Sequence, residues 1–212
     1  MASSQTSQVA DGRSARRERN REAVIDAFID LIMNGENDPS VDDIADKAGV
    51  SYRSVYRYFE DRTDMMAAAA DRAMQWIRPL LVEASGPYKA NDPLDHRIDA
   101  VVDARSEVYM QIAEVLRTAL LRSNSEPFVA NELYQARELL REQINVRFAN
   151  ELDAFSPRER ELRLTSIDQT LQFQSLEYVM HDRGHTREEL ERYLRGQIRL
   201  ALITPEADLD PR

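Results

Sequence analysis

Stretches rich in Ala, Leu, Glu, Arg and Gln run along most of the chain, and these residue types are good helix formers. Only six glycines occur among the 212 residues, and the alternation of Val, Ile and Thr that is typical of strands is nearly absent. Short segments containing Gly, Pro, Ser and Asn separate the helix-forming stretches. The sequence therefore predicts an all-α fold.

Composition narrows the class of protein. Apolar residues make up 42% of the chain and charged residues 31%, with a net charge of −10, which is typical of a soluble globular protein. The absence of cysteine excludes disulfides, cysteine-ligated zinc, iron–sulfur clusters and thiol nucleophiles. No apolar run approaches the roughly 20 residues of a membrane span, and none follows the first basic residues as in a secretory signal. We expect a cytoplasmic protein with no cofactor, no bound metal and no membrane partner.

The first sixty residues contain a tail and three predicted helices. Residues 1–12 are small and polar, and we expect them to form a disordered tail. A basic cluster follows and leads into a helix that ends near Met33, before a loop containing Gly and Pro. Its inner face carries the helical stripe Val24, Phe28, Leu31 and Ile32. Residues 13–60 are predicted to form one small helical domain.

The capping signals within that domain predict a helix-turn-helix. Ser40, with Asp43 three residues later, suits the start of a second helix, and Gly49 suits its left-handed end. Ser51 can cap a third short helix over residues 52–59, with Val55 and Phe59 turned inward. Two short helices joined by a tight turn make a helix-turn-helix, although the pattern by itself is only moderately specific.

The outward residues of the third helix favour nucleic acid. They comprise two arginines, three tyrosines and one serine, without any acid, and arginine can chelate guanine in the major groove. Acidic residues outnumber basic ones over residues 1–60, but they lie in the preceding segment. The positive charge of the third helix should affect a bound nucleic acid more than the acids of the preceding segment do, because the Debye length is only about 8 Å at physiological salt. The alternative is a solvated face of a helical bundle.

Residues 40–62, SVDDIADKAGVSYRSVYRYFEDR, resemble the tetracycline-repressor (TetR) family of bacterial transcription regulators. About 50 residues (16–66) share the resemblance, and the rest of the chain fits the family only in its helical layout. The resemblance implies a three-helix DNA-binding domain followed by a larger effector-binding and dimerisation domain. It also implies a regulator, more often a repressor, that a small-molecule effector releases from a palindromic operator.

The resemblance assigns DNA contacts to particular residues. Tyr52, Arg53 and Ser54 would approach bases or the adjacent phosphates. Phosphate contacts are implied for Ser40, Tyr56, Tyr58 and Arg62. Arg53 replaces a residue that is usually small in the family, and Ser54 replaces the more usual Thr, so the operator sequence is not predicted. The complete predicted set is Arg17, Ser40, Tyr52, Arg53, Ser54, Tyr56, Arg57, Tyr58 and Arg62.

Residues 61–204 are predicted to form the larger helical domain, followed by a flexible acidic tail over 205–212. Ser156 before Pro157, and Thr186 before Glu189, mark the starts of its last two helices, which extend to about His181 and Ile203. Both helices carry two apolar stripes, and the second stripe indicates either a partner or a deeper core of the chain itself. The family uses such a helix pair for dimerisation, so we expect a homodimer. The predicted interface is Leu164, Ile167, Leu171, Tyr178, Leu190, Leu194 and Ile198.

An effector site is predicted less specifically. Arg105 falls on the apolar stripe of a long helix, where it would either bind an acidic effector, pair with a carboxylate of the protein or lie at a domain interface. Aromatic residues are more often ordinary core residues, but some would line a largely apolar effector cavity. The predicted effector set is Trp76, Arg105, Tyr109, Tyr134, Phe148 and Phe173.

An enzyme is disfavoured by the motifs. His181 and His185 have the i, i+4 spacing of metal ligands, but Gly184 between them should end the helix, so the two rings need not share a face. The chain contains no glycine-rich phosphate loop and no Gly-x-Ser-x-Gly elbow. The alternative to a DNA-binding regulator is a helical module that binds a small molecule or a protein without sequence-specific DNA binding.

Overall fold

The computed structural model describes residues 3–83 and 92–205, without the side chains of residues 3–13, Leu81 and Glu83. These residues form helices and no strands, as predicted. The helices are α1 (Ser3–Met33), α2 (Val41–Ala48), α3 (Tyr52–Tyr58), α4 (Arg62–Glu83), α5 (Leu94–Arg122), α6 (Pro127–Arg147), α7 (Ala149–Leu152), α8 (Pro157–Thr170), α9 (Phe173–Glu177), the π-helical turn η1 (Tyr178–Asp182) and α10 (Arg187–Ile203).

The chain divides into two compact units. The N-terminal unit comprises the residues up to 76 together with 114–130, and the C-terminal unit comprises 77–113 and the residues from 131 onward. This division differs from the boundary predicted between residues 60 and 61. The reason is that Met65, Met66, Ala69 and Ala73 of α4 are buried and belong with α1–α3. The predicted acidic tail lies outside the described residues except at its first residue, Pro205.

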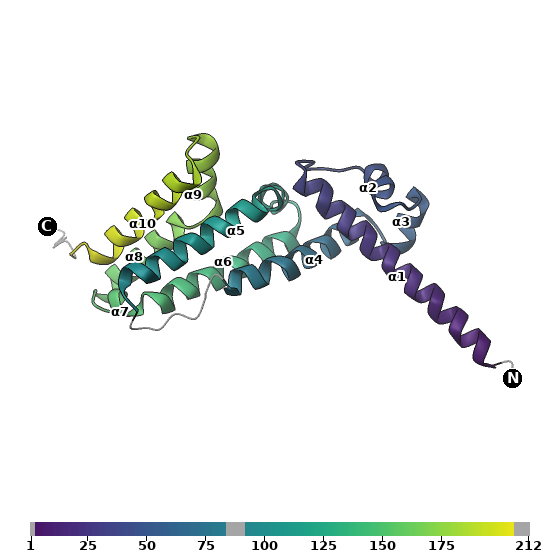
Figure 1. Ribbon diagram of the computed structural model, residues 1–212, viewed down its shortest axis with the longest axis horizontal. Helices are drawn as coiled ribbons and strands as arrows, with labels where there is room; N and C mark the ends of the chain where they lie inside the picture. Colours follow the sequence, from purple (N-terminus) through teal and green to yellow (C-terminus); the bar gives the residue numbers. More distant parts are fainter. Residues whose placement is uncertain (1–2, 84–91, 206–212) are drawn as a thin grey trace. The chain divides into compact units, whose positions relative to one another are not determined.

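The N-terminal unit is built on α1, against which α2 and α3 pack (Figure 1). Val24, Phe28, Leu31 and Ile32 are buried, as the helical stripe predicted. The prediction of a disordered tail over residues 1–12 is wrong for residues 3–12, which continue α1 as helix. The stretch before residue 13 contains no proline, and its single glycine costs only about 1 kcal/mol in a helix that is already nucleated.

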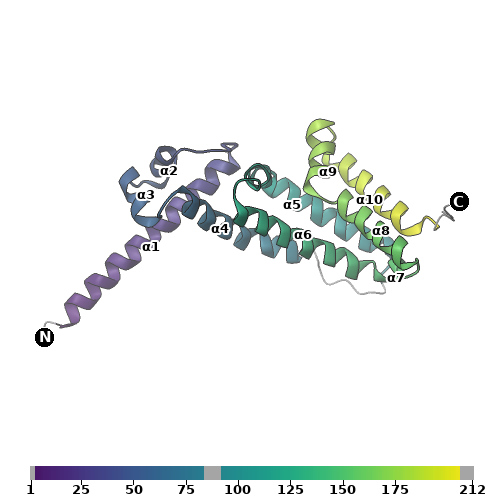
Figure 2. The same cartoon turned by 180° about the vertical axis from the view of Figure 1, so that it is seen from behind.

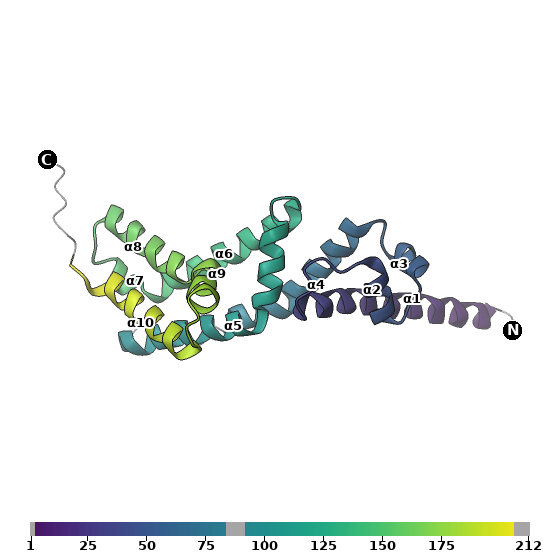
Figure 3. The ribbon, with the colours of Figure 1, turned by 90° about the horizontal axis from the view of Figure 1, so that it is seen from above.

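The C-terminal unit has its core between α5, α6, α7, α8 and α10. Figures 1 and 2 show α8 and α10 side by side, and Figure 3 shows α10 lying along the N-terminal part of α5. Ion pairs hold that second contact, because Arg195 binds both Asp99 and Asp103 at 2.7 Å, and Arg199 binds Asp95. Ile98, Val102, Ile144, Phe148, Leu152, Leu190 and Leu194 are among the buried apolar residues of this core.

The stripe predicted to face a dimer partner faces the core instead. Leu164, Ile167, Leu171, Leu190, Leu194 and Ile198 are all at most 5% exposed within the single chain, so only Tyr178 of the predicted interface is accessible. The large apolar residues that remain exposed on α8, η1 and α10 form a second stripe: Leu162, Tyr178, Tyr193, Leu200 and Ile203. Sequence periodicity alone does not show which apolar positions the core covers.

The helix predicted over residues 157–181 is interrupted. Gln172 has an extended backbone (φ −69°, ψ 148°) and separates α8 from α9, and the π-helical turn follows directly after α9. Gly184, with φ +69°, ends this segment in the left-handed conformation that glycine adopts without strain. His181 therefore lies within the π-helical turn, whereas His185 lies beyond it. In the described part of the chain, no group of three or more His, Asp or Glu residues is arranged to hold a metal ion.

Candidate nucleic-acid interface

Local caps fix the position of α3 relative to α2. The Ser40 side chain accepts a hydrogen bond from the Asp43 amide (3.1 Å), and the Asp43 carboxylate accepts from the Ser40 amide (3.2 Å), which completes a capping box. Gly49 ends α2 with φ +66°, a backbone conformation that a side chain would strain. Ser51 then caps α3 by accepting a hydrogen bond from the Ser54 amide (3.2 Å). The predicted helix-turn-helix is thus present with each predicted cap.

The face of α3 that points away from α1 is polar and basic. Val55 and the following Phe59 are buried, while Tyr52, Arg53, Tyr56 and Arg57 are exposed. No acidic residue occurs on this helix. The face therefore presents two guanidinium groups and two phenols to solvent, which are the donors that base edges and phosphates accept.

The tyrosines of α3 are oriented by their neighbours. The rings of Tyr52 and Tyr56 lie 5.2 Å apart, and the Tyr52 hydroxyl donates to that of Tyr56 (3.3 Å). This hydrogen bond raises the pKa of Tyr52 above its ordinary value. Tyr58 is half-buried and accepts a hydrogen bond from the Asn20 amide nitrogen (3.0 Å), which leaves its own proton available to an acceptor.

Arg17 reaches α3 from α1. Its guanidinium donates a hydrogen bond to the backbone carbonyl of Arg57 (3.1 Å), near the C-terminal end of α3. A cation at that end also interacts favourably with the helix dipole. The contact brings a third arginine beside the exposed face of α3.

Arg62 is less available than predicted. Its guanidinium forms an ion pair with Asp38 and donates a hydrogen bond to the Pro39 carbonyl (2.9 Å). A phosphate approaching the N-terminus of α4 would therefore compete with Asp38 for this side chain. Its predicted DNA contact remains a prediction.

The sequence analysis missed the group that holds Asp38. Arg122, at the end of α5, forms an ion pair with Asp38 and donates to the Asn37 carbonyl (3.1 Å), while Thr118 donates to the Asn37 side chain (3.0 Å). The hydrogen bond from Arg122 holds the pKa of the Asp38 carboxyl below its ordinary value. These partners are more than 80 residues apart in sequence, so no local signal could have revealed them.

The predicted effector residues are not brought together. Trp76 and Tyr134 are largely exposed, and Trp76 belongs to the N-terminal unit. Tyr109 and Phe173 do meet, with ring centroids 5.6 Å apart, and the Tyr109 hydroxyl donates to Glu177 (2.9 Å). Phe148 is fully buried, as an ordinary core residue would be. Arg105 is buried and forms no ion pair with a carboxylate of the described residues, so the structure does not show the pairing with a protein acid that was one of the alternatives for it.

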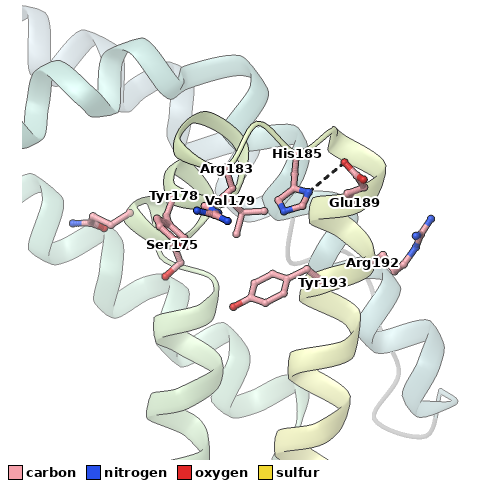
Figure 4. Close-up of a pocket in the computed structure, with 9 residues that line it drawn as sticks. Ser175, Tyr178, Val179, Arg183, His185, Glu189, Arg192 and Tyr193 are labelled. Carbon is pink, nitrogen blue, oxygen red and sulfur yellow. Dashed lines mark ion pairs between the residues drawn. The ribbon is translucent and has the colours of Figure 1, made fainter.

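A separate hollow of about 690 Å³ lies where η1 meets α10 (Figure 4). Tyr193 of α10 points toward the segment that carries Ser175 and Tyr178, and His185 lies 3.4 Å from Glu189. Gly184, which was expected to end the helix before His185, was the one indirect sign of it in the sequence. The hollow is lined by Gln174, Ser175, Tyr178, Val179, Arg183, His185, Glu189, Arg192 and Tyr193.

Comparisons with known proteins agree with this architecture. Residues 34–69 match the family of bacterial regulatory proteins described as the tetR family. Over 95 residues the chain is 32% identical to the HTH-type transcriptional repressor LfrR of Mycolicibacterium smegmatis, a match that spans 45% of this chain and about half (48%) of that protein.

Two solved structures share the fold over most of the chain. A transcriptional regulator from Rhodococcus sp. Rha1 has a TM-score of 0.64 at 22% identity, covering 88% of this chain and 95% of the other. A tetR-family transcriptional regulator from Streptomyces coelicolor has a TM-score of 0.65 at 23% identity, covering 85% and 81% respectively. With the capped helix-turn-helix, the match of residues 34–69 shows that this segment is similar to the bacterial regulatory proteins of the tetR family, and the two solved structures show the shared fold of the chain.

Proposed function

We propose that this chain is a sequence-specific DNA-binding regulator of transcription that acts as a homodimer and represses its target genes. The observation that carries the proposal is the exposed, acid-free face of α3, which a capped turn holds clear of the core. A short helix presented in this way fits the major groove, which admits an α-helix.

The predicted contacts divide into two kinds. Arg53 would read base edges from the first turn of α3, whereas Arg17, Tyr56 and Tyr58 would bind phosphates beside the groove. The hydroxyl of the half-buried Ser54 is hydrogen-bonded to that of Ser51 (2.8 Å), and the Ser40 hydroxyl accepts from the Asp43 amide. The hydroxyls of Ser54 and Ser40 would therefore each bind DNA only through a hydrogen bond that these contacts do not use. Most contacts would then be to phosphates, and affinity would fall steeply as salt rises.

The second apolar stripe of the C-terminal unit supports dimerisation. Tyr193, Leu200 and Ile203 lie on one face of α10, and Gly196 on the same face has open space around it. A glycine between large apolar residues allows two helices to approach closely. Two copies joined on this stripe would present two α3 helices to a roughly palindromic operator. A largely apolar small molecule bound in the C-terminal unit would shift the equilibrium between DNA-binding and released states.

Selection from a random pool of DNA duplexes tests the proposal. The purified chain should enrich a palindrome, and a variant carrying Arg53→Ala with Arg57→Ala should not. The matched control carries Arg78→Ala with Arg158→Ala, which removes two exposed arginines from the C-terminal unit and should leave the enriched sequence unchanged. If the folded wild-type dimer enriches nothing at low salt, α3 serves another partner, and the chain is a binding module without sequence-specific DNA binding.

A further inference from the structure

Arg105 is a buried cation whose guanidinium is only partly bonded. It lies on α5 within the C-terminal unit and is 6% exposed. Its Nη2 donates a hydrogen bond to the Leu140 carbonyl of α6 (3.2 Å). Its Nη1 is covered by protein and has no hydrogen-bond partner among the described residues. A buried donor without a partner is unfavourable, and a buried charge without compensation is more so.

The charges around Arg105 do not neutralise it. Asp168 is the carboxylate whose charge acts on it, but Asp168 is already ion-paired with Arg141 (3.6 Å) and accepts a hydrogen bond from Gln172 (2.9 Å). Arg147, itself only 3% exposed, adds a second positive charge nearby. Burial and Arg147 together lower the pKa of Arg105 to about 10, so it remains charged at neutral pH.

Both arginines border one small cavity between α5 and α6. The cavity has a volume of about 10 Å³, enough for roughly one small atom or molecule the size of water. No carboxylate of the described residues lines it. A water molecule there would accept a hydrogen bond from Nη1 but would leave the positive charge of Arg105 uncompensated. An anion would accept the same hydrogen bond and also compensate the charge. The cavity is lined by Val101, Ala104, Arg105, Gln143, Ile144 and Arg147.

We propose that this cavity binds one small monoanion, a halide or a single carboxylate group, which accepts a hydrogen bond from Arg105 Nη1. Arg147 strengthens the binding electrostatically, and the small volume of the cavity excludes larger anions. The Leu140 carbonyl, bonded to Nη2, fixes the guanidinium in the orientation that directs Nη1 at the anion.

Two sources could supply such an anion. A free inorganic or organic monoanion would act as a structural ion of the C-terminal unit, independently of any DNA binding. The carboxylate of an acidic effector would place its apolar remainder toward the surrounding helices, and this second source rests on the effector role proposed above.

The first test compares the thermal stability of the full-length chain in sodium bromide and in sodium gluconate at equal sodium concentration. Gluconate is too large for the cavity, so bromide should raise the Tm, by roughly 5–10 °C when its concentration is about 100 times its dissociation constant. Arg105→Gln should abolish the difference, and Arg158→Gln, which removes an exposed arginine elsewhere, should retain it. A crystal soaked in bromide should show an anomalous peak beside Arg105.

Equal Tm values of the wild type in the two salts, together with no anomalous peak beside Arg105, would overturn the proposal. A bromide effect that survives in Arg105→Gln would overturn it as well, because the ion would then bind elsewhere. The anomalous peak is measured on the wild type, so it shows whether bromide binds beside Arg105 even if Arg105→Gln fails to fold.

A series of formate, acetate, butyrate and octanoate distinguishes the two sources. Stabilisation that is greatest for formate and falls as the chain lengthens identifies a free anion. Stabilisation that grows with chain length identifies the head group of an effector, and the same acids should then release DNA from the wild type. Failure of DNA selection would refute the proposed function and leave the bromide result standing, so the two failures are distinguishable.

Discussion

Replacing Glu151 by Gln should destabilise the C-terminal unit by about 2–3 kcal/mol. Glu151 of α7 binds Arg97 of α5 through two hydrogen bonds, one of 2.8 Å from Nη1 and a shorter one from Nη2. Arg97 is 4% exposed. The substitution keeps the shape of the side chain but removes its charge, so an amide NH2 group faces a guanidinium NH2 group and the buried cation loses its counterion.

The magnitude follows from the contacts that remain. Breaking a buried ion pair by removing one partner costs roughly 3–5 kcal/mol. Arg97 keeps two carbonyl acceptors, those of Arg147 (2.7 Å) and Asp92 (3.0 Å), and Glu151 itself is partly exposed, which together lower the expected cost. The exposed pair of Arg192 and Glu188 provides the matched control, because Glu188→Gln should cost at most about 0.5 kcal/mol.

Equilibrium unfolding in urea at one protein concentration measures the effect. With a slope of about 2–3 kcal/mol/M, the midpoint of Glu151→Gln should fall by roughly 1 M without a change in slope. Arg97→Met combined with Glu151→Gln should cost less than the sum of the two single variants, because no charge is left unpaired. A loss below about 0.5 kcal/mol, or costs that simply add, would refute the claim that this ion pair is desolvated.

Three further results are expected. Ser40→Ala should lower the free energy of unfolding by about 1 kcal/mol in urea, because the Asp43 amide loses its capping acceptor; an unchanged midpoint would contradict this. The pKa of Asp38 is lower in the folded than in the unfolded chain. Its contribution to the free energy of unfolding is therefore complete above the unfolded pKa of roughly 3.9 and is lost as pH falls through the folded pKa. The Tm difference between wild type and Asp38→Asn should therefore be constant from about pH 7 to about pH 5 and shrink as pH falls further. A difference that stays constant in acid would exclude the ion pairs as its cause. In analytical ultracentrifugation Leu200→Glu should shift the chain to monomer while Val146→Glu, an exposed site on α6, should not; equal behaviour of the two would exclude α10 as the interface.

Local signals predicted several helix starts to the residue. Ser40, Gly49, Ser51 and Thr186 act on backbone groups within a few residues of themselves, so the starts of α2, α3 and α10 and the end of α2 follow from adjacent sequence. The early start of α1 and the interruption after α8 lack such a marker. Whether the weak helix formers of α1 stay helical, and where a long helix breaks, depends on packing that no local pattern encodes.

The sequence by itself determined that the chain is helical, that a capped turn separates α2 from α3, and that α3 carries basic and phenolic side chains without acids. These properties depend on backbone propensity and on periodicity along one helix. Only the tertiary structure decided which apolar stripe of α8 and α10 meets the core, that Asp38 is held by Arg122 from a distant helix, and that Arg105 is buried without a carboxylate partner. Periodicity shows that a face is apolar. Contacts between helices far apart in the chain determine what packs on that face and which group pairs with each buried charge.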